Sequence, residues 1–202
     1  MTSATQPTTV RLLETPAARA LADLTSMADD LQVVLRCCER LLAELGADEP
    51  DDLVVEALWT TALLSYGRCF HDAGRGMVLS DDDVKGTPLQ GDVIGWHGVL
   101  RQLRKHYAAP VANPRERFSV GVAQDAGGAA SGVAITSARQ PMLDDVTVRQ
   151  TGALAYELTL VVERRMTEQQ ERVLATAQGM AATELNALPL VDVASVEGTE
   201  PA

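Results

Sequence analysis

The stretch from Leu53 to Phe70 reads LVVEALWTTALLSYGRCF and is the most apolar run in the chain. In a helix its apolar residues lie on more than one face, which is typical of a helix in the middle of a bundle. A strand of this length would be unusual, and no turn signal interrupts the run. We therefore expect a central helix here. Its core residues should be Leu58, Trp59, Leu63, Tyr66 and Phe70.

The composition favours one helical domain. The chain has 202 residues, of which 46% are hydrophobic and only 3% aromatic, so its core consists mainly of Leu, Val and Ala. These residues favour helices. Lys and Arg total 17 against 28 Asp and Glu, a formal net charge of −11. Such a surface repels nucleic acid and anionic membranes on average, so an anion site requires a local basic patch.

The cysteines and the N-terminal sequence predict a cytoplasmic protein without a membrane segment. Cys37, Cys38 and Cys69 form an odd set without a CxxC motif, and we expect them to be reduced and buried. The first ten residues lack the features of a signal peptide, and no apolar run is long enough to span a membrane.

Neither a metal nor a cofactor is expected. Residues 80–83 read SDDD, but they lack the calcium-loop spacing and are typical of a capped helical turn. His71, His97 and His106 are scattered, without an HExxH motif. The Gly-rich stretch at residues 125–131 contains neither GxxxxGK[ST] nor GxGxxG.

A long first helix is predicted between Thr15-Pro16, a favourable start, and Gly46, a favourable stop. Its apolar residues follow a heptad pattern, in which they alternate at spacings of three and four. They are Leu24, Met27, Leu31, Val34, Cys38, Leu41 and Leu45. This seam packs either inside its own chain or against a second subunit. The seam and the charged helix after Glu163 lead us to expect a homodimer.

Two more helices and a hairpin complete the prediction. One helix covers about residues 92–108, and a longer one begins at Asp144-Asp145. Between them, two alternating runs flank the Gly-rich connector and predict a β-hairpin at about residues 117–137. Because two strands alone are marginally stable, we expect this hairpin to lie on the helices.

The predicted fold class is mainly α, a bundle of four long helices with a β-hairpin between the third and fourth. Residues 1–14 are expected to form a flexible arm, and residues 15–185 a single helical domain. Residues 186–202 are acidic and rich in small side chains, so a disordered tail is expected there.

One basic cluster stands out on this acidic chain. It comprises Arg101, Arg104, Lys105, Arg115 and Arg117, with His106 beside them. In a helix, many of these side chains lie opposite the buried stripe of the third helix. The cluster is either a solvated helix face or a site for phosphate groups of RNA or a nucleotide.

The segment Arg101 to His106 reads RQLRKH, an Arg followed by four residues and a His. An Arg and a His with this spacing near the end of a helix, in an all-helical chain, resemble the motif of the HEPN superfamily. The run LRKHYA at residues 103–108 is similar to a stretch of HEPN-like proteins of unassigned function. Two positions depart from the pattern. Gln102 follows the first Arg, and Ala109 or Pro110 stands where the longer pattern has a second His.

The resemblance implies a helical protein that binds RNA or a nucleotide, such as a metal-independent ribonuclease of a toxin or phage-defence system. It implies that His106 transfers the proton of a ribose 2′-hydroxyl and that Arg101 stabilises the phosphate. Arg104, Lys105, Arg115 and Arg117 would add phosphate affinity. If Arg104 sets the register instead, the catalytic His is missing and the protein is an inactive relative. The second hypothesis is a non-enzymatic helical interaction or adaptor protein that works as a dimer.

Overall fold

The computed structural model describes residues 8–72, 74–109, 113, 116–139 and 143–193. Within these residues the chain is mainly helical, as predicted. The helices are α1 (Pro16–Leu45), α2 (Asp52–Arg68), α3 (Asp81–Lys85), α4 (Val93–Tyr107), α5 (Asp145–Gln178) and α6 (Ala182–Ala187). The strands are β1 (Thr9–Arg11), β2 (Glu116–Gln124), β3 (Ala130–Arg139) and β4 (Leu190–Asp192).

The helices begin at polar side chains that accept backbone hydrogen bonds. The Thr15 hydroxyl accepts from the Ala18 N–H at 3.2 Å and starts α1. Asp92 and Asp144 do the same for α4 and α5, with distances of 2.8 and 2.7 Å to the N–H groups of Gly95 and Thr147. These caps satisfy N–H groups that have no partner inside the helix, and they confirm the predicted starts.

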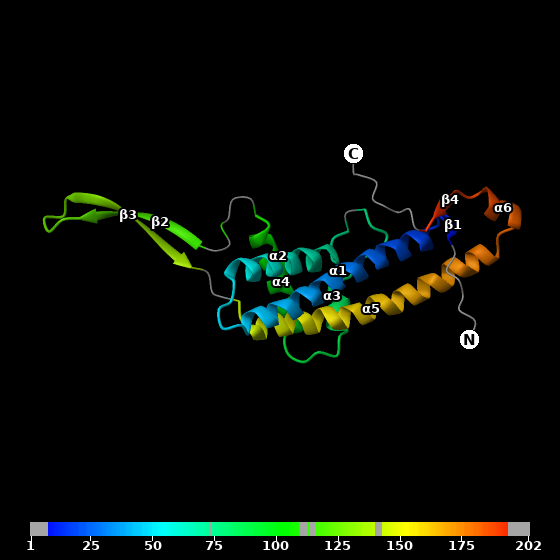
Figure 1. Cartoon of the computed structure of the whole chain (residues 1–202), viewed down its shortest axis with the longest axis horizontal. Helices are drawn as coiled ribbons and strands as arrows, with labels where there is room; N and C mark the ends of the chain where they lie inside the picture. Colours follow the sequence, from blue (N-terminus) through cyan, green and yellow to red (C-terminus); the bar gives the residue numbers. More distant parts are fainter. Residues whose placement is uncertain (1–7, 73, 110–112, 114–115, 140–142, 194–202) are drawn as a thin grey trace.

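Helix α1 packs against both α5 and α2, and it lies between them in the helical body (Figure 1). Its heptad residues from Leu24 to Leu41 are buried inside the chain. The seam therefore packs within its own chain and does not face a second subunit.

Helix α2 buries one side, including Trp59, Leu63 and Tyr66, as predicted for the core. Leu58 and Phe70 are only partly buried, and Leu53 and Val54 near the start of α2 are exposed. Helix α2 therefore lies between α1 and α4 but leaves its first turn exposed, because apolar residues on several faces of a helix do not require neighbours on all of them.

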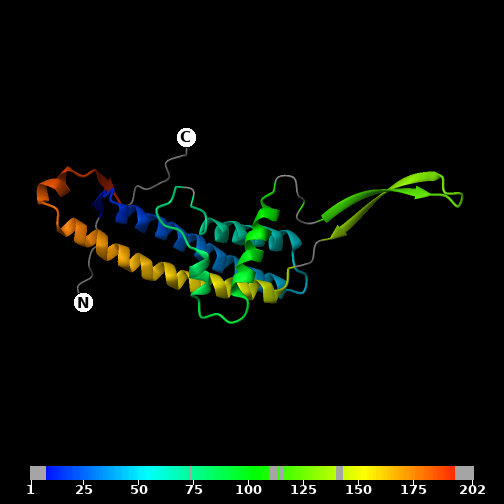
Figure 2. The ribbon, with the colours of Figure 1, turned by 180° about the vertical axis from the view of Figure 1, so that it is seen from behind.

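Helix α4 crosses the other helices at a steep angle instead of running along them (Figure 2). It contacts α2 and α3, and Leu100 is its fully buried residue. The segment after α2 returns to the body at Leu79, whose N–H donates to the Cys69 carbonyl at 3.0 Å. Helix α4 therefore lies against α2, and α3 lies against α4 and α5.

The predicted hairpin is present as the antiparallel pair β2–β3, with Val120 opposite Ile135 and Val122 opposite Val133. It extends away from the helices in both views (Figures 1 and 2). Phe118, Val120, Val122, Val133 and Ile135 are all exposed. The expectation that the hairpin lies on the helices is therefore wrong.

A second two-stranded sheet joins segments from the two ends of the described chain. Strand β1 pairs antiparallel with β4, with Val10 opposite Val191. Residues 9–11 were expected in a flexible arm and residues 190–192 in a disordered tail, and the structure places both in this sheet instead. It lies at the end of the molecule away from the hairpin (Figure 1).

Candidate functional site

The predicted basic cluster lies mainly in the last turn and a half of α4, where its side chains diverge. Arg101 is half exposed and faces α3, with Nη1 3.7 Å from Oδ1 of Asp81. Positions five apart on a helix differ by about 140° in direction, so Arg101 and His106 do not share a face. No hydrogen bond or ion pair joins these two described residues. A single chain therefore does not bring the predicted catalytic pair together.

Arg104 lies over the backbone of α2. A Cβ atom built on Gly67 would come within 2.6 Å of Cδ of Arg104, so the arginine stem occupies the space that Gly67 leaves open. Among the described residues, Nε of Arg104 and Nε2 of His106 are buried without a hydrogen-bond partner. Lys105 is exposed. Cations in a last helical turn also compensate the negative end of the helix dipole, which accounts for this part of the cluster without a ligand.

Of the remaining basic candidates, Arg117 is exposed at the root of the hairpin, in β2. Arg115 lies outside the described residues. The structure therefore gives three separate positions to the basic residues that it describes, namely the α3-facing side of α4, the end of α4 and the hairpin root.

Sequence reasoning missed a buried polar group around His97. The imidazole is only 3% exposed, and its Nδ1 lies 2.7 Å from the Tyr66 hydroxyl. The ring also packs on Phe70, with ring centroids 4.5 Å apart. On the other side, Nε2 lies 3.4 Å from Asp81. Because the Asp81 carboxylate can only accept, the neutral tautomer that suits both neighbours carries its proton on Nε2 and accepts at Nδ1 from the Tyr66 hydroxyl.

The environment of His97 favours its neutral form. Burial lowers the pKa of His97 from its ordinary value of 6.5, Asp81 acts to raise it, and Arg101 acts with burial. Burial also raises the pKa of Tyr66 far above its ordinary range, so its hydroxyl stays protonated. The imidazole is enclosed by the core and cannot reach a substrate, so this group stabilises the fold. The spacing of three residues between His97 and the buried Leu100 was the sequence signal available for this burial.

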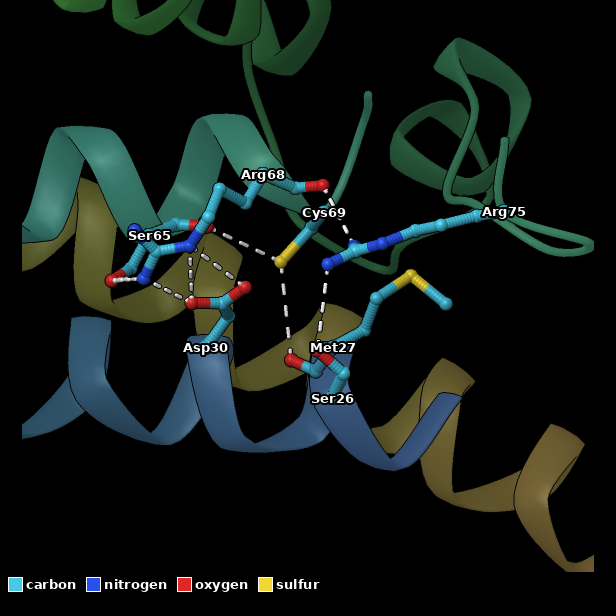
Figure 3. Close-up of polar contacts among 7 residues, drawn as sticks. All are labelled: Ser26, Met27, Asp30, Ser65, Arg68, Cys69 and Arg75. Atoms are coloured by element: carbon cyan, nitrogen blue, oxygen red, sulfur yellow. Dashed lines mark hydrogen bonds and ion pairs between the residues drawn. The ribbon is translucent and has the colours of Figure 1, made fainter. Parts of the chain in front are cut away.

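A second polar group joins α1 to α2 (Figure 3). Asp30 is buried, and both of its oxygens accept from Nε of Arg68, at 2.9 and 3.1 Å. Arg68 Nη2 also donates to Asp30 and, at 2.8 Å, to the Ser65 hydroxyl. Arg75 then donates to the carbonyl of Arg68 at 3.0 Å. These interactions satisfy the Asp30 carboxylate, so the group is structural and leaves no oxygen poised for chemistry.

The cysteines and the metal-ligating residues offer no reactive centre in the described part of the chain. Burial raises the pKa of Cys38 and of Cys69 to about 12, so both remain thiols at neutral pH. No group of three His, Cys, Asp or Glu side chains in these residues has the arrangement of a metal site. In the same residues, the helices are too short or too polar to cross a bilayer.

A hollow of about 450 Å³ lies between the start of α4 and α5, with Trp96, Val99 and Leu154 in its lining. Its one charged lining residue, Asp92, already caps α4. The hollow therefore offers apolar walls but no uncommitted charged group for chemistry.

The hairpin departs from the usual pattern in which large apolar side chains are buried. Paired residues of an antiparallel sheet point to the same side, so five apolar side chains share one face. They are Phe118, Val120, Val122, Val133 and Ile135, and they are 57–73% exposed. The opposite face carries small residues such as Ser119, Gly121 and Thr136. We call the first of these the apolar hairpin face.

The hairpin is also nearly uncharged. Asp125 is the one charged residue from Phe118 to Ala138, on a chain in which 22% of residues are charged. Its Oδ1 accepts from the N–H groups of Gly127 and Ala129, both at 2.9 Å, and so shapes the turn. Gly128 has a positive φ of 86° that this turn requires. The turn therefore uses the one charged side chain between Phe118 and Ala138.

Comparisons with known proteins gave no match to a family model, a curated protein or a solved structure.

Proposed function

We propose that this protein is a non-enzymatic interaction protein that binds through the apolar hairpin face. The observation that carries the proposal is that five large apolar side chains are 57–73% exposed on one face of a hairpin that stands away from the helices. A contiguous exposed apolar patch is typical of a surface that another molecule covers.

The edges of the hairpin support the same function. Natural sheets protect exposed edge strands with charged residues or Pro. Residues 118–138 contain no Lys, Arg, Glu or Pro, and Asp125 lies in the turn. Both strands therefore also present unprotected backbone groups to a partner.

The proposal is tested by photocrosslinking from the two faces of one strand. A photoreactive amino acid is placed at Val122, on the apolar hairpin face, or at Ala123, on the opposite face. We expect a defined crosslinked protein from position 122 that is absent or much weaker from position 123. Its identity is established by mass spectrometry, and its binding is reproduced with purified components. Equal crosslinking from both positions, or none from either, contradicts the proposal.

A second candidate is the RNA- or nucleotide-phosphate site that the HEPN resemblance implies. It is favoured by one observation: Lys105 and Arg117 are exposed cations on a strongly acidic chain, and Arg104 and His106 have buried nitrogens without a partner among the described residues. A catalytic version needs Arg101 and His106 from different subunits, because one helix directs them apart.

This candidate has its own experiment. Wild type and His106→Ala are incubated with unstructured RNA and with tRNA in the absence of metal. Cleavage by wild type that the variant loses supports the ribonuclease, and equal cleavage by both indicates a contaminant. Without cleavage, salt-dependent RNA binding that weakens in Lys105→Ala and Arg117→Ala supports an inactive phosphate-binding protein. The matched control is Arg149→Ala, an exposed arginine paired with Asp145 on α5.

A further inference from the structure

We infer that the partner of the apolar hairpin face is a second copy of this chain, and that the two hairpins pack face to face in an antiparallel arrangement. The inference rests on the proposed function, since it names the partner of the same surface. It replaces the seam of α1, which is buried inside the chain, as the origin of a dimer.

The chemistry of the face is self-complementary. A two-fold dimer places each surface patch against its own copy, so a patch that carries charge repels itself. The apolar hairpin face has no charged side chain, and its members are Val, Ile and Phe. Nucleic acid is a poor partner for such a face, because it offers no cation to a phosphate.

The area of the face is sufficient for a reversible dimer. Side chains of these sizes at 57–73% exposure present roughly 500 Å² of apolar surface per copy, so a dimer buries on the order of 1,000 Å². This total is near the lower limit of specific interfaces. The expected dimer is therefore a reversible one, at the low end of specific interfaces.

The net negative charge of the chains favours the antiparallel arrangement of the two hairpins. Each chain carries a formal net charge of −11, so two helical bodies side by side repel each other. A nine- or ten-residue strand spans about 30 Å, several times the Debye length of about 8 Å at physiological ionic strength. With the tips pointing in opposite directions, the hairpins separate the two bodies by this length.

The test is sedimentation equilibrium of the full chain at about 10–100 μM, concentrations that populate a weak, reversible dimer. Wild type should show a species of twice the chain mass of 21.5 kDa. The variant Val120→Lys/Ile135→Lys puts two charges on the apolar hairpin face and should be monomeric. The control Ser119→Lys/Thr136→Lys adds the same charges to the neighbouring cross-strand pair on the opposite face and should remain dimeric. Equal dimerisation of all three proteins overturns the inference.

A crosslinking measurement with Cys variants controls for the case in which the Lys variants lose the hairpin structure. Val120 lies at the centre of the face, where a two-fold axis between antiparallel hairpins passes. Under mild oxidation Val120→Cys should form a disulfide-linked dimer, while Ser119→Cys should not. The native cysteines are buried and serve as an internal background. Crosslinking through position 119 alone, or through both positions equally, overturns the face-to-face arrangement.

The outcomes separate this inference from the proposed function. A monomeric wild type overturns the second copy as partner, and the photocrosslinking experiment still decides whether another protein binds the face. A monomeric wild type that floats with neutral phosphatidylcholine vesicles, and loses this property in Val120→Lys/Ile135→Lys, overturns the inference in favour of a lipid surface.

Discussion

Tyr66, His97 and Asp81 show how single residues tie stability to pH. The folded state lowers the pKa of His97, while the unfolded chain has the ordinary value of 6.5. Between these two values the unfolded state binds more protons than the folded state, so acid favours unfolding. The contribution of His97 is complete above about pH 6.5 and is lost as the pH falls toward the folded pKa.

We therefore predict that the free energy of unfolding, measured with urea, decreases as the pH falls below about 6.5. The variant His97→Gln lacks the titrating group, so its profile should be flatter in this interval even though its stability is lower at pH 8. The variant His71→Gln changes an exposed histidine and serves as the matched control. Parallel profiles for wild type and His97→Gln would show that the imidazole is not the source.

A substitution of Trp59 tests the packing of the core, again at the scale of a single residue. It is 2% exposed on the side of α2 that packs into the body. Trp59→Ala should lower the free energy of unfolding by about 3–5 kcal/mol, since a large buried side chain leaves a cavity that the surroundings fill only in part. Val54→Ala changes an exposed residue on the same helix and should cost less than about 0.5 kcal/mol. Equal effects of the two changes would contradict the packing of α2.

At the scale of elements, Asp30 and Arg68 provide the polar connection between α1 and α2. Arg68→Ala should lower the free energy of unfolding by about 1–3 kcal/mol, because the buried carboxylate of Asp30 then lacks its donors. The double variant Asp30→Asn/Arg68→Ala should recover part of this loss, since no buried charge remains. Additive effects in this double-mutant cycle, measured by urea unfolding, would show that the two groups do not act together.

The sequence predicted the boundaries of the elements better than their arrangement. Thr15, Asp92 and Asp144 were readable as helix starts because a cap is a local interaction within three residues. The position of the hairpin was not readable, because alternation of Val and Ile shows which side chains share a face and not what covers them. Strands β1 and β4 were missed, since three residues carry too little periodicity. The burial of His97 was missed because it depends on Tyr66 in α2 and on Phe70 just after it.

For the candidate site, the sequence predicted which residues to consider but not how they are arranged. The spacing of Arg101 and His106 already indicated different faces, and α4 continues through both positions. The residues that determine where each of these side chains lies are on other elements. Asp81 lies beside Arg101, and Gly67 leaves the space that Arg104 occupies. No local pattern in residues 101–106 contains them.

At the scale of the whole molecule, the helical body lies between two small sheets, the β2–β3 hairpin and the β1–β4 sheet. The β1–β4 sheet joins the segment before α1 to the segment after α6, and all three residues of β1 are exposed. Such a sheet opens locally at low cost while the core remains intact.

The variant Val191→Pro should therefore release β1 with little effect on the rest of the protein, because Pro removes a backbone donor from the ladder. Hydrogen–deuterium exchange of residues 9–11 should become fast, while the global free energy of unfolding changes by less than about 1 kcal/mol. Leu158→Ala, in the core of α5, is the contrasting control, with an expected loss of about 2–5 kcal/mol. A global loss in Val191→Pro as large as that of Leu158→Ala would show that this sheet is part of the cooperative core.

The packing of α1 against α5 also has a consequence for folding during translation. The 99 residues from Gly46 to Asp144 separate the two helices in the sequence. At about 5–20 residues per second, the ribosome needs roughly 5–20 s to add them, and α5 must then be made as well. During this interval part of the apolar seam of α1 has α2 as a neighbour but not its main partner. The nascent chain is therefore a substrate for chaperones until α5 emerges, and translation speed between the two helices sets how long that exposure lasts.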